Sequence, residues 1–195
     1  MKLMNRCLRG CRMSALVFLL LFGHGSAIFA QTPANPYKNN LKVTMLSLLS
    51  GSTKLTYERS LSDSRSLEFT AGVIGWGGDY LNHNHSSGGL GRLAYKFIFH
   101  GRPGLQGFYL KPELAYSTFT YDAKEDDVRK RTSRLAVMGC FGYQVVFHRF
   151  VFDVFSGLGA GLGSGNDYNY YHGFIGLGPS SHAAFTSGFK LGVAF

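Results

Sequence analysis

Hydrophobic and polar residues alternate with a period of two along most of the chain after residue 31. A period of two is the side-chain period of a β-strand, whereas a surface helix repeats every 3.6 residues. The alternation predicts an all-β chain of eight consecutive strands, each with a bulky apolar face and a small or charged face. The predicted strands are 41–50, 53–61, 66–73, 92–99, 108–118, 134–145, 150–162 and 185–195.

The glycine-rich run FSGLGAGLGSG, at 155–165, overlaps the seventh of these strands. A dinucleotide-binding loop requires the spacing G-x-G-x-x-G between a strand and a helix, and this run keeps alternating instead. We therefore interpret it as a strand whose glycines line a narrow space, while Leu158 and Leu162 lie on the opposite face.

Two kinds of barrel fit the alternation, because the pattern alone does not say which face lies inside. A soluble secreted barrel that binds an apolar ligand turns its apolar face inward, and a membrane barrel turns that face outward. Small residues dominate the polar face, and an eight-stranded barrel has an interior just wide enough to be filled by side chains. This volume argument favours the membrane barrel and leaves the soluble barrel as the alternative.

Charged residues of the predicted strands also segregate, and with one exception, Arg59, they fall on the polar face. A Lys or Arg facing lipid at the bilayer centre costs about 2–4 kcal/mol, which explains such segregation. Both signs occur on this face, so we expect ion pairs that plug a polar lumen rather than an open channel. The predicted lumen network consists of Glu58, Glu68, Glu113, Asp153, Lys54, Arg92, Lys96, Lys111, Arg134 and Lys190.

The connections between the predicted strands alternate in length. Outer-membrane barrels have short periplasmic turns and longer external loops, which is the same arrangement. The first connection, near Gly51 and Ser52, is shorter than this pattern requires. Short turns are predicted at 62–65, 100–107 and 148, and longer loops at 75–89, 122–131 and 163–182.

The first thirty residues have the layout of a cleaved secretory signal peptide. Four basic residues precede the short apolar core SALVFLLLF, and a small-residue site ends at Ala30. We expect residues 31–40 to form a periplasmic lead and 41–195 to form the barrel. Without the first thirty residues the chain has 16 basic and 11 acidic residues, so the net charge falls from +9 to +5. This modest charge does not indicate nucleic-acid binding.

The final predicted strand carries Phe189, Leu191, Val193 and Phe195 on its apolar face. With these residues and the eight-strand pattern, the chain resembles the small eight-stranded outer-membrane barrels of Gram-negative bacteria, the OmpA/OmpX-like superfamily. The segment 47–73 is similar to the first hairpins of uncharacterised Bacteroidetes-type barrel proteins. The resemblance implies an outer-membrane location, contact with lipid and lipopolysaccharide, and recognition of the C-terminal strand by the barrel-assembly machinery.

One stretch offers candidate catalytic chemistry, because His85 and Ser87 have the His-x-Ser spacing of outer-membrane lipid A deacylases. By this resemblance Ser87 is the nucleophile, His85 its base and Glu113 the group that orients the base. Gly88 replaces the asparagine of those enzymes, and the motif lies early in the chain rather than late. We therefore expect a polar outer loop without catalysis, and keep a lipid A-modifying hydrolase as the alternative.

The remaining polar motifs have simpler interpretations. Histidines at 83, 85, 172 and 182 fall in predicted outer loops without the spacing of a metal site, so we expect neither a metal nor a cofactor. The mixed-charge run at 122–131 is a solvated loop or a contact for lipopolysaccharide phosphates, and the run at 166–174 is an adhesive surface or an aromatic rim. Cys140, the single cysteine after residue 31, is expected to be a small lumen residue. The external partner of the loops is not indicated by the sequence.

Overall fold

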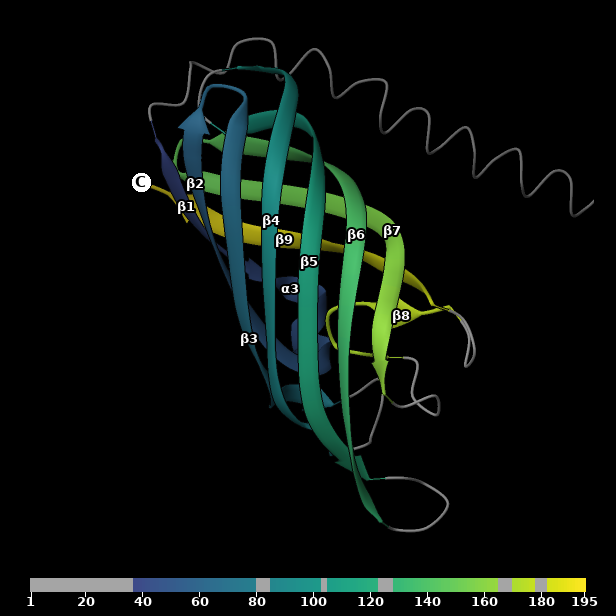
Figure 1. Cartoon of the computed structure of the whole chain (residues 1–195). Coiled ribbons are helices and arrows are strands. Elements are labelled where there is room, and N and C mark those ends of the chain that lie inside the picture. Colours follow the sequence, from purple (N-terminus) through teal and green to yellow (C-terminus); the bar gives the residue numbers. More distant parts are fainter. Residues whose placement is uncertain (1–36, 80–84, 103–104, 123–127, 165–169, 178–181) are drawn as a thin grey trace, which may run out of the picture. The chain divides into compact units, whose positions relative to one another are not determined.

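Eight antiparallel strands close into a barrel in the computed structural model, which describes residues 37–79, 85–102, 105–122, 128–164, 170–177 and 182–195 (Figure 1). Each barrel strand pairs with the next along the chain, and β1 pairs with β9 to close the sheet. The barrel strands are β1 (Asn39–Thr44), β2 (Ser50–Ser62), β3 (Arg65–Asp79), β4 (Ser87–Arg102), β5 (Gln106–Asp122), β6 (Arg129–Phe147), β7 (Phe150–Ser164) and β9 (Ala183–Ala194).

The two ends of the barrel differ. At the turn end, two residues join β2 to β3 and two residues join β6 to β7. The opposite end, here called the loop end, carries the five-residue helix α3 (Met45–Leu49) and the two-residue strand β8 (Ile175–Gly176), which pairs with β9 (Figure 1). Among the described residues, no helix has the length and apolar character needed to cross a bilayer.

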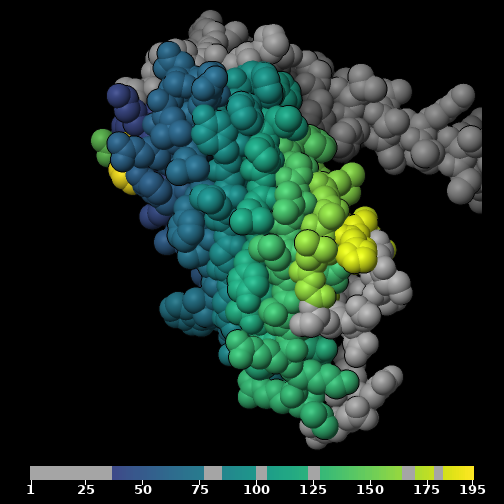
Figure 2. Space-filling view, viewed as in Figure 1, coloured from purple at the N-terminus to yellow at the C-terminus, as the bar shows by residue number. Residues whose placement is uncertain are grey.

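Side chains alternate between the two faces of the barrel wall along most of each strand. On β5, for example, Leu110 and Leu114 are 49% and 44% exposed, whereas Lys111 and Glu113 are buried. Figure 2 shows one side of the barrel, over which outward side chains of β3 to β7 form a continuous surface. The bulky apolar face therefore points outward and the charged face points inward, because the interior of eight strands has room for a limited set of side chains.

The prediction of one continuous strand over 41–50 is wrong. β1 ends at Thr44 and α3 follows it directly. The hydroxyl of Ser47 donates to the carbonyl of Thr44 at 2.6 Å, and this local bond competes with the pairing of an extended strand. The first connection is thus the helix at 45–49, and the region of Gly51 and Ser52 lies within β2.

Several strands are longer than the alternation predicted, so they enter segments that we expected to be loops. β5 has 17 residues and β6 has 19 residues. β6 begins at Arg129 and therefore includes the last part of the mixed-charge run at 122–131. The predicted loop at 163–182 contains β8, which pairs with the start of β9 through Ile175–Phe185 and Gly176–Ala184.

Candidate functional site

A cluster of opposite charges lies inside the barrel, in the half nearer the turn end. We call it the central cluster and define it as Lys42, Glu58, Glu68, Lys96 and Asp153. Its members come from five strands, β1, β2, β3, β4 and β7, and each has at most 2% of its surface exposed. Inward-facing positions of a barrel converge on its axis, which brings residues distant in sequence together.

Two lysines hold the central cluster together. The Lys42 Nζ lies 2.7 Å from Glu58, 2.9 Å from Glu68 and 2.7 Å from Asp153. The Lys96 Nζ lies 3.2, 3.2 and 3.1 Å from the same three carboxylates. Each ammonium group therefore bridges all three carboxylates, and removal of either lysine would leave buried negative charges with fewer partners.

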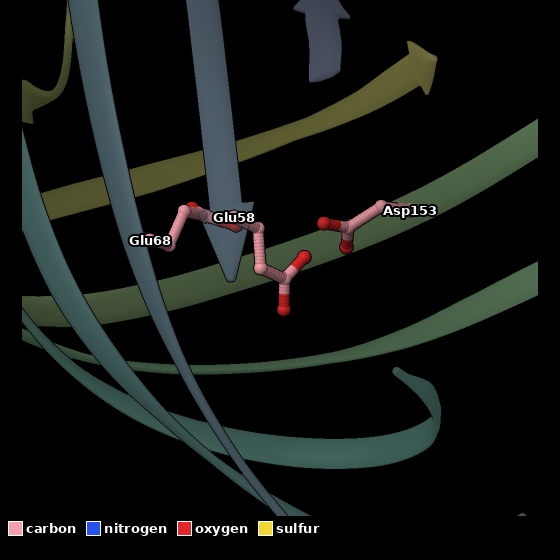
Figure 3. Close-up of side chains that lie close together, drawn as sticks. All are labelled: Glu58, Glu68 and Asp153. Atoms are coloured by element: carbon pink, nitrogen blue, oxygen red, sulfur yellow. The ribbon is translucent and has the colours of Figure 1, made fainter. Parts of the chain in front are cut away.

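Three carboxylates of the central cluster lie close enough to hold a metal ion, with one oxygen of each within 4.8 Å of the others (Figure 3). Figure 3 shows Glu58, Glu68 and Asp153 converging from β2, β3 and β7. Lys42 and Lys96 already supply positive charge between these carboxylates, so the arrangement is a set of lysine ion pairs rather than an acidic metal site. The three carboxylates therefore already have cationic partners inside the barrel.

Neutral side chains complete the hydrogen bonding of the central cluster. The Gln144 Oε1 accepts from both Lys42 and Lys96 at 2.9 Å. The Tyr109 hydroxyl donates to Asp153 Oδ1 at 2.6 Å, and the Ser66 hydroxyl donates to Glu58 Oε1 at 2.5 Å. Buried charges are stable in a protein interior when hydrogen bonds satisfy their remaining atoms, which these groups do.

Further ion pairs extend from the central cluster toward the loop end. Lys111 and Lys190 contact Glu68 at 2.8 and 2.5 Å. Lys111 also contacts Glu113 at 2.8 Å, and the Arg92 Nε donates to Glu113 at 2.6 Å. Within the described part of the barrel, seven basic and four acidic side chains are buried, so the interior has three more positive than negative charges.

Replacing Tyr109 by phenylalanine is expected to lower the free energy of unfolding by about 2 kcal/mol, since a hydrogen bond to a charged group is lost without a change in shape. The measurement is urea unfolding of the refolded barrel, followed by the fluorescence of Trp76, the single tryptophan. Tyr116→Phe is the matched control, because Tyr116 is 48% exposed on the outer face of the same strand. An equal effect of both changes would contradict the role of Tyr109.

Residues of the 166–174 run close the loop end of the lumen. Tyr171 and Phe174 are 0% and 2% exposed, and their rings stack at 5.3 Å. The Arg134 Nη1 donates to the Tyr171 hydroxyl at 2.9 Å. Our interpretation of this run as an adhesive surface or an interfacial rim is therefore wrong for these residues, which form an internal plug; 165–169 lie outside the described residues.

The candidate catalytic residues are not brought together. His85 and Ser87 are exposed at the loop end, and the Nδ1 atom of His85 lies 3.7 Å from Oδ2 of Asp122. Glu113 lies inside the barrel, where it is paired with Arg92 and Lys111. Ser87 pairs with Thr120, which is seven residues from Glu113 along β5, or about 23 Å of strand. A relay from Ser87 through His85 to Glu113 therefore has no geometric basis in this arrangement.

The remaining histidines and the cysteine of the predicted sites differ in their surroundings. His182 is exposed and His172 is buried against Phe119 and Tyr170, with ring centroids 4.9 Å apart in both pairs. His83 and residues 123–127 of the mixed-charge run lie outside the described residues. Cys140 is fully buried in the lumen, next to Gly157.

Several residues of the interior network were not predicted from the sequence. Lys42 is the most connected of them, and Gln144 and Tyr109 are next. The alternation of Leu41, Lys42 and Val43 indicates that Lys42 faces the lumen, since it places Lys42 on the polar face. Leu46 and Leu48, which follow, interrupt the alternation and obscure the polar face on which Lys42 lies.

The residues of the expected assembly signal lie on β9. Leu191, Val193 and Phe195 are 41%, 46% and 56% exposed, and Phe189 is partly exposed. β9 pairs with β7 over eleven residue pairs and with β1 over five. The apolar residues of this strand therefore form part of the outward face of the barrel.

Comparisons of the chain with protein-family models, with curated proteins and with solved structures gave no match.

Proposed function

We propose that the chain is an integral outer-membrane β-barrel protein with a plugged polar lumen, which acts structurally or through surface binding by its loop end rather than by catalysis. The observation that carries the proposal is the outward apolar face. Soluble monomers rarely expose contiguous apolar patches larger than a few hundred Å², and larger patches mark contact with a membrane or a partner. Here the outward face is apolar on every barrel strand.

The height of the apolar face suits a bilayer. On β5 the outward residues Phe108, Leu110, Pro112, Leu114 and Tyr116 follow one another. They span about 27 Å along the strand. A strand that crosses a bilayer at a tilt needs about 9–11 residues, and these positions cover that length.

The interior supports a sealed barrel rather than a pore. Ion pairs fill the middle, the Tyr171–Phe174 plug covers the loop end, and a smaller apolar cluster with Val146, Val151 and Ala194 lies toward the turn end. Because each layer is packed, no continuous path for solutes is expected. The alternative of a soluble barrel for an apolar ligand is less well supported, since most of the large apolar side chains of the strands point outward and charged side chains occupy much of the lumen.

Partners follow from the same proposal. Lipid and lipopolysaccharide contact the outward face, and the barrel-assembly machinery binds β9 during insertion. The lipid A-modifying hydrolase is not favoured, because its three candidate residues are dispersed.

Cysteine labelling tests the proposal. On a Cys140→Ala background, Val137→Cys (57% exposed in the wild type) and Ala136→Cys (1% exposed) are neighbours on opposite faces of β6. In outer-membrane vesicles, a fluorophore at position 137 is expected to be quenched by spin-labelled lipid, while position 136 stays unlabelled. Recovery of the protein as a water-soluble monomer without detergent, with no quenching at 137, would contradict the proposal.

A further inference from the structure

A side pocket opens in the barrel wall at the loop end, where β1 stops short. The pairing of β1 with β9 ends at Thr44 and Lys190, so the first part of β9 continues without β1 beside it. The short strand β8 pairs there instead, through Ile175–Phe185 and Gly176–Ala184. Between α3, β8 and β9 the structure leaves a cavity of about 330 Å³, at the lower end of the range for small-molecule pockets.

The walls of the side pocket are largely apolar. Leu46 and Leu49 of α3 line one side, and Phe174, Ile175 and Phe185 line the other. Leu46, Leu49 and Ile175 are 48%, 51% and 41% exposed, so the pocket opens through apolar side chains. Such a passage suits an alkyl chain, which gains free energy when it leaves water for apolar surroundings.

A buried lysine lies at the inner part of the side pocket. Lys54 is 5% exposed, and it makes no hydrogen bond or ion pair with any described residue, unlike Lys42, Lys96, Lys111 and Lys190. Its charged neighbours are Arg92, Lys190 and Glu113, so the positive charges outnumber the negative one. The residue opposite Lys54 on β3 is Gly72, which offers no carboxylate.

A second polar group of the side pocket also lacks a partner. The Thr44 hydroxyl is buried and makes no hydrogen bond within the described part of the chain. Thr44 and Lys54 both line the pocket, so a cation and a hydroxyl donor are available to one ligand. Burying a charge without a partner is costly, and a bound anion would relieve this cost.

We propose that the side pocket binds a long-chain carboxylate, with its alkyl chain between α3 and β9 and its carboxylate at Lys54 and Thr44. One unpaired ammonium group matches one negative charge, which favours a carboxylate over a more highly charged phosphate head. The entry of the ligand from the bilayer rests on the proposed membrane location, whereas the binding site itself does not.

Native mass spectrometry of the refolded chain in a neutral saccharide detergent tests this proposal. Three probes share one chain length and differ in the head group: hexadecanoate, hexadecanol and hexadecyl phosphate. Two variants probe the site. Lys54→Met removes the cation proposed to bind the head group, and Ser187→Trp places a bulky side chain at the exposed side of the pocket. Lys38→Met, an exposed lysine near the turn end, is the matched control, and heat-modifiable gel mobility verifies that each variant is folded.

The wild-type chain is expected to bind one hexadecanoate, and to bind hexadecanol and hexadecyl phosphate more weakly. Lys54→Met should weaken hexadecanoate binding by about tenfold or more, because a charge-assisted contact is lost. Ser187→Trp should abolish binding of all three probes, and Lys38→Met should change none.

Equal binding of hexadecanoate and hexadecanol, or binding that Lys54→Met leaves unchanged, would overturn the proposal. Tighter binding of hexadecyl phosphate would overturn the assignment to a carboxylate. A water-soluble chain that binds hexadecanoate through Lys54 would refute the membrane location and leave the site intact, so the two failures are distinguishable.

Discussion

Replacing Lys42 by methionine is expected to lower the free energy of unfolding by about 3–5 kcal/mol, the cost of breaking a buried ion pair by removing one partner. Lys42 contacts all three carboxylates of the central cluster and is fully buried. Methionine fills nearly the same volume without the charge, so three negative groups keep Lys96 as their shared partner. Urea unfolding of the refolded barrel, followed by Trp76 fluorescence, measures the loss.

Two further variants make the Lys42 result specific. Lys38→Met removes an exposed lysine and is expected to change the free energy of unfolding by less than about 0.5 kcal/mol. Adding Asp153→Asn to Lys42→Met removes one of the uncompensated charges, so the double variant should lose less than the sum of its single changes. Additive losses, or a loss from Lys42→Met as small as that from Lys38→Met, would refute the role of the cluster.

Replacing Leu158 by arginine is expected to destabilise the barrel in phospholipid vesicles by about 2–4 kcal/mol, the cost of a cation facing lipid near the bilayer centre. Leu158 is 62% exposed at the middle of β7, on the outward face. In a water-exposed barrel the same change would remain within about 0.5 kcal/mol. The measurement is again unfolding by urea, here of the protein inserted in vesicles.

An arginine introduced near the end of the barrel provides the control for Leu158→Arg. Val128 is also an exposed apolar residue, 53% exposed, and it lies just before β6 at the loop end. Val128→Arg is expected to cost at most about 1 kcal/mol, since the penalty falls toward the interface. Equal effects at both positions would contradict a lipid environment around the middle of the barrel.

The strands and the orientation of their faces could be predicted from the sequence because both are local properties. Alternation with a period of two defines a strand, and the small volume of one face indicates which side fits inside eight strands. The helix at Met45–Leu49 could not be predicted in this way, because its leucines fit a strand as well as a helix. Its formation depends on local bonds, in which the Ser47 hydroxyl donates to the Thr44 carbonyl and the Ser50 hydroxyl donates to the Ser47 carbonyl.

The sequence could predict that ion pairs form in the interior, but not which residues form each pair. The sequence indicates that Glu68 and Lys190 share the lumen, but their contact depends on the register of strands separated by 122 positions. A different register, that of β2 against β3, decides that Lys54 faces Gly72 and remains without a carboxylate opposite it. Tyr171 and Phe174 point into the lumen because other strands leave space for them there. A local sequence pattern cannot predict that space.

The seam between β1 and β9 has a consequence for the order of folding. Asn39 and Phe195 meet there although they lie 156 positions apart, and the seam contains five residue pairs against sixteen for β5 and β6. Contacts so distant in sequence form slowly, because a long stretch of chain must first be ordered. Until β9 arrives, β1 and β7 present unsatisfied backbone edges that invite pairing with another molecule. The strands from β1 to β7 are thus expected to assemble first as an open sheet, whose two free borders at β1 and β7 need protection from aggregation until the ring is complete.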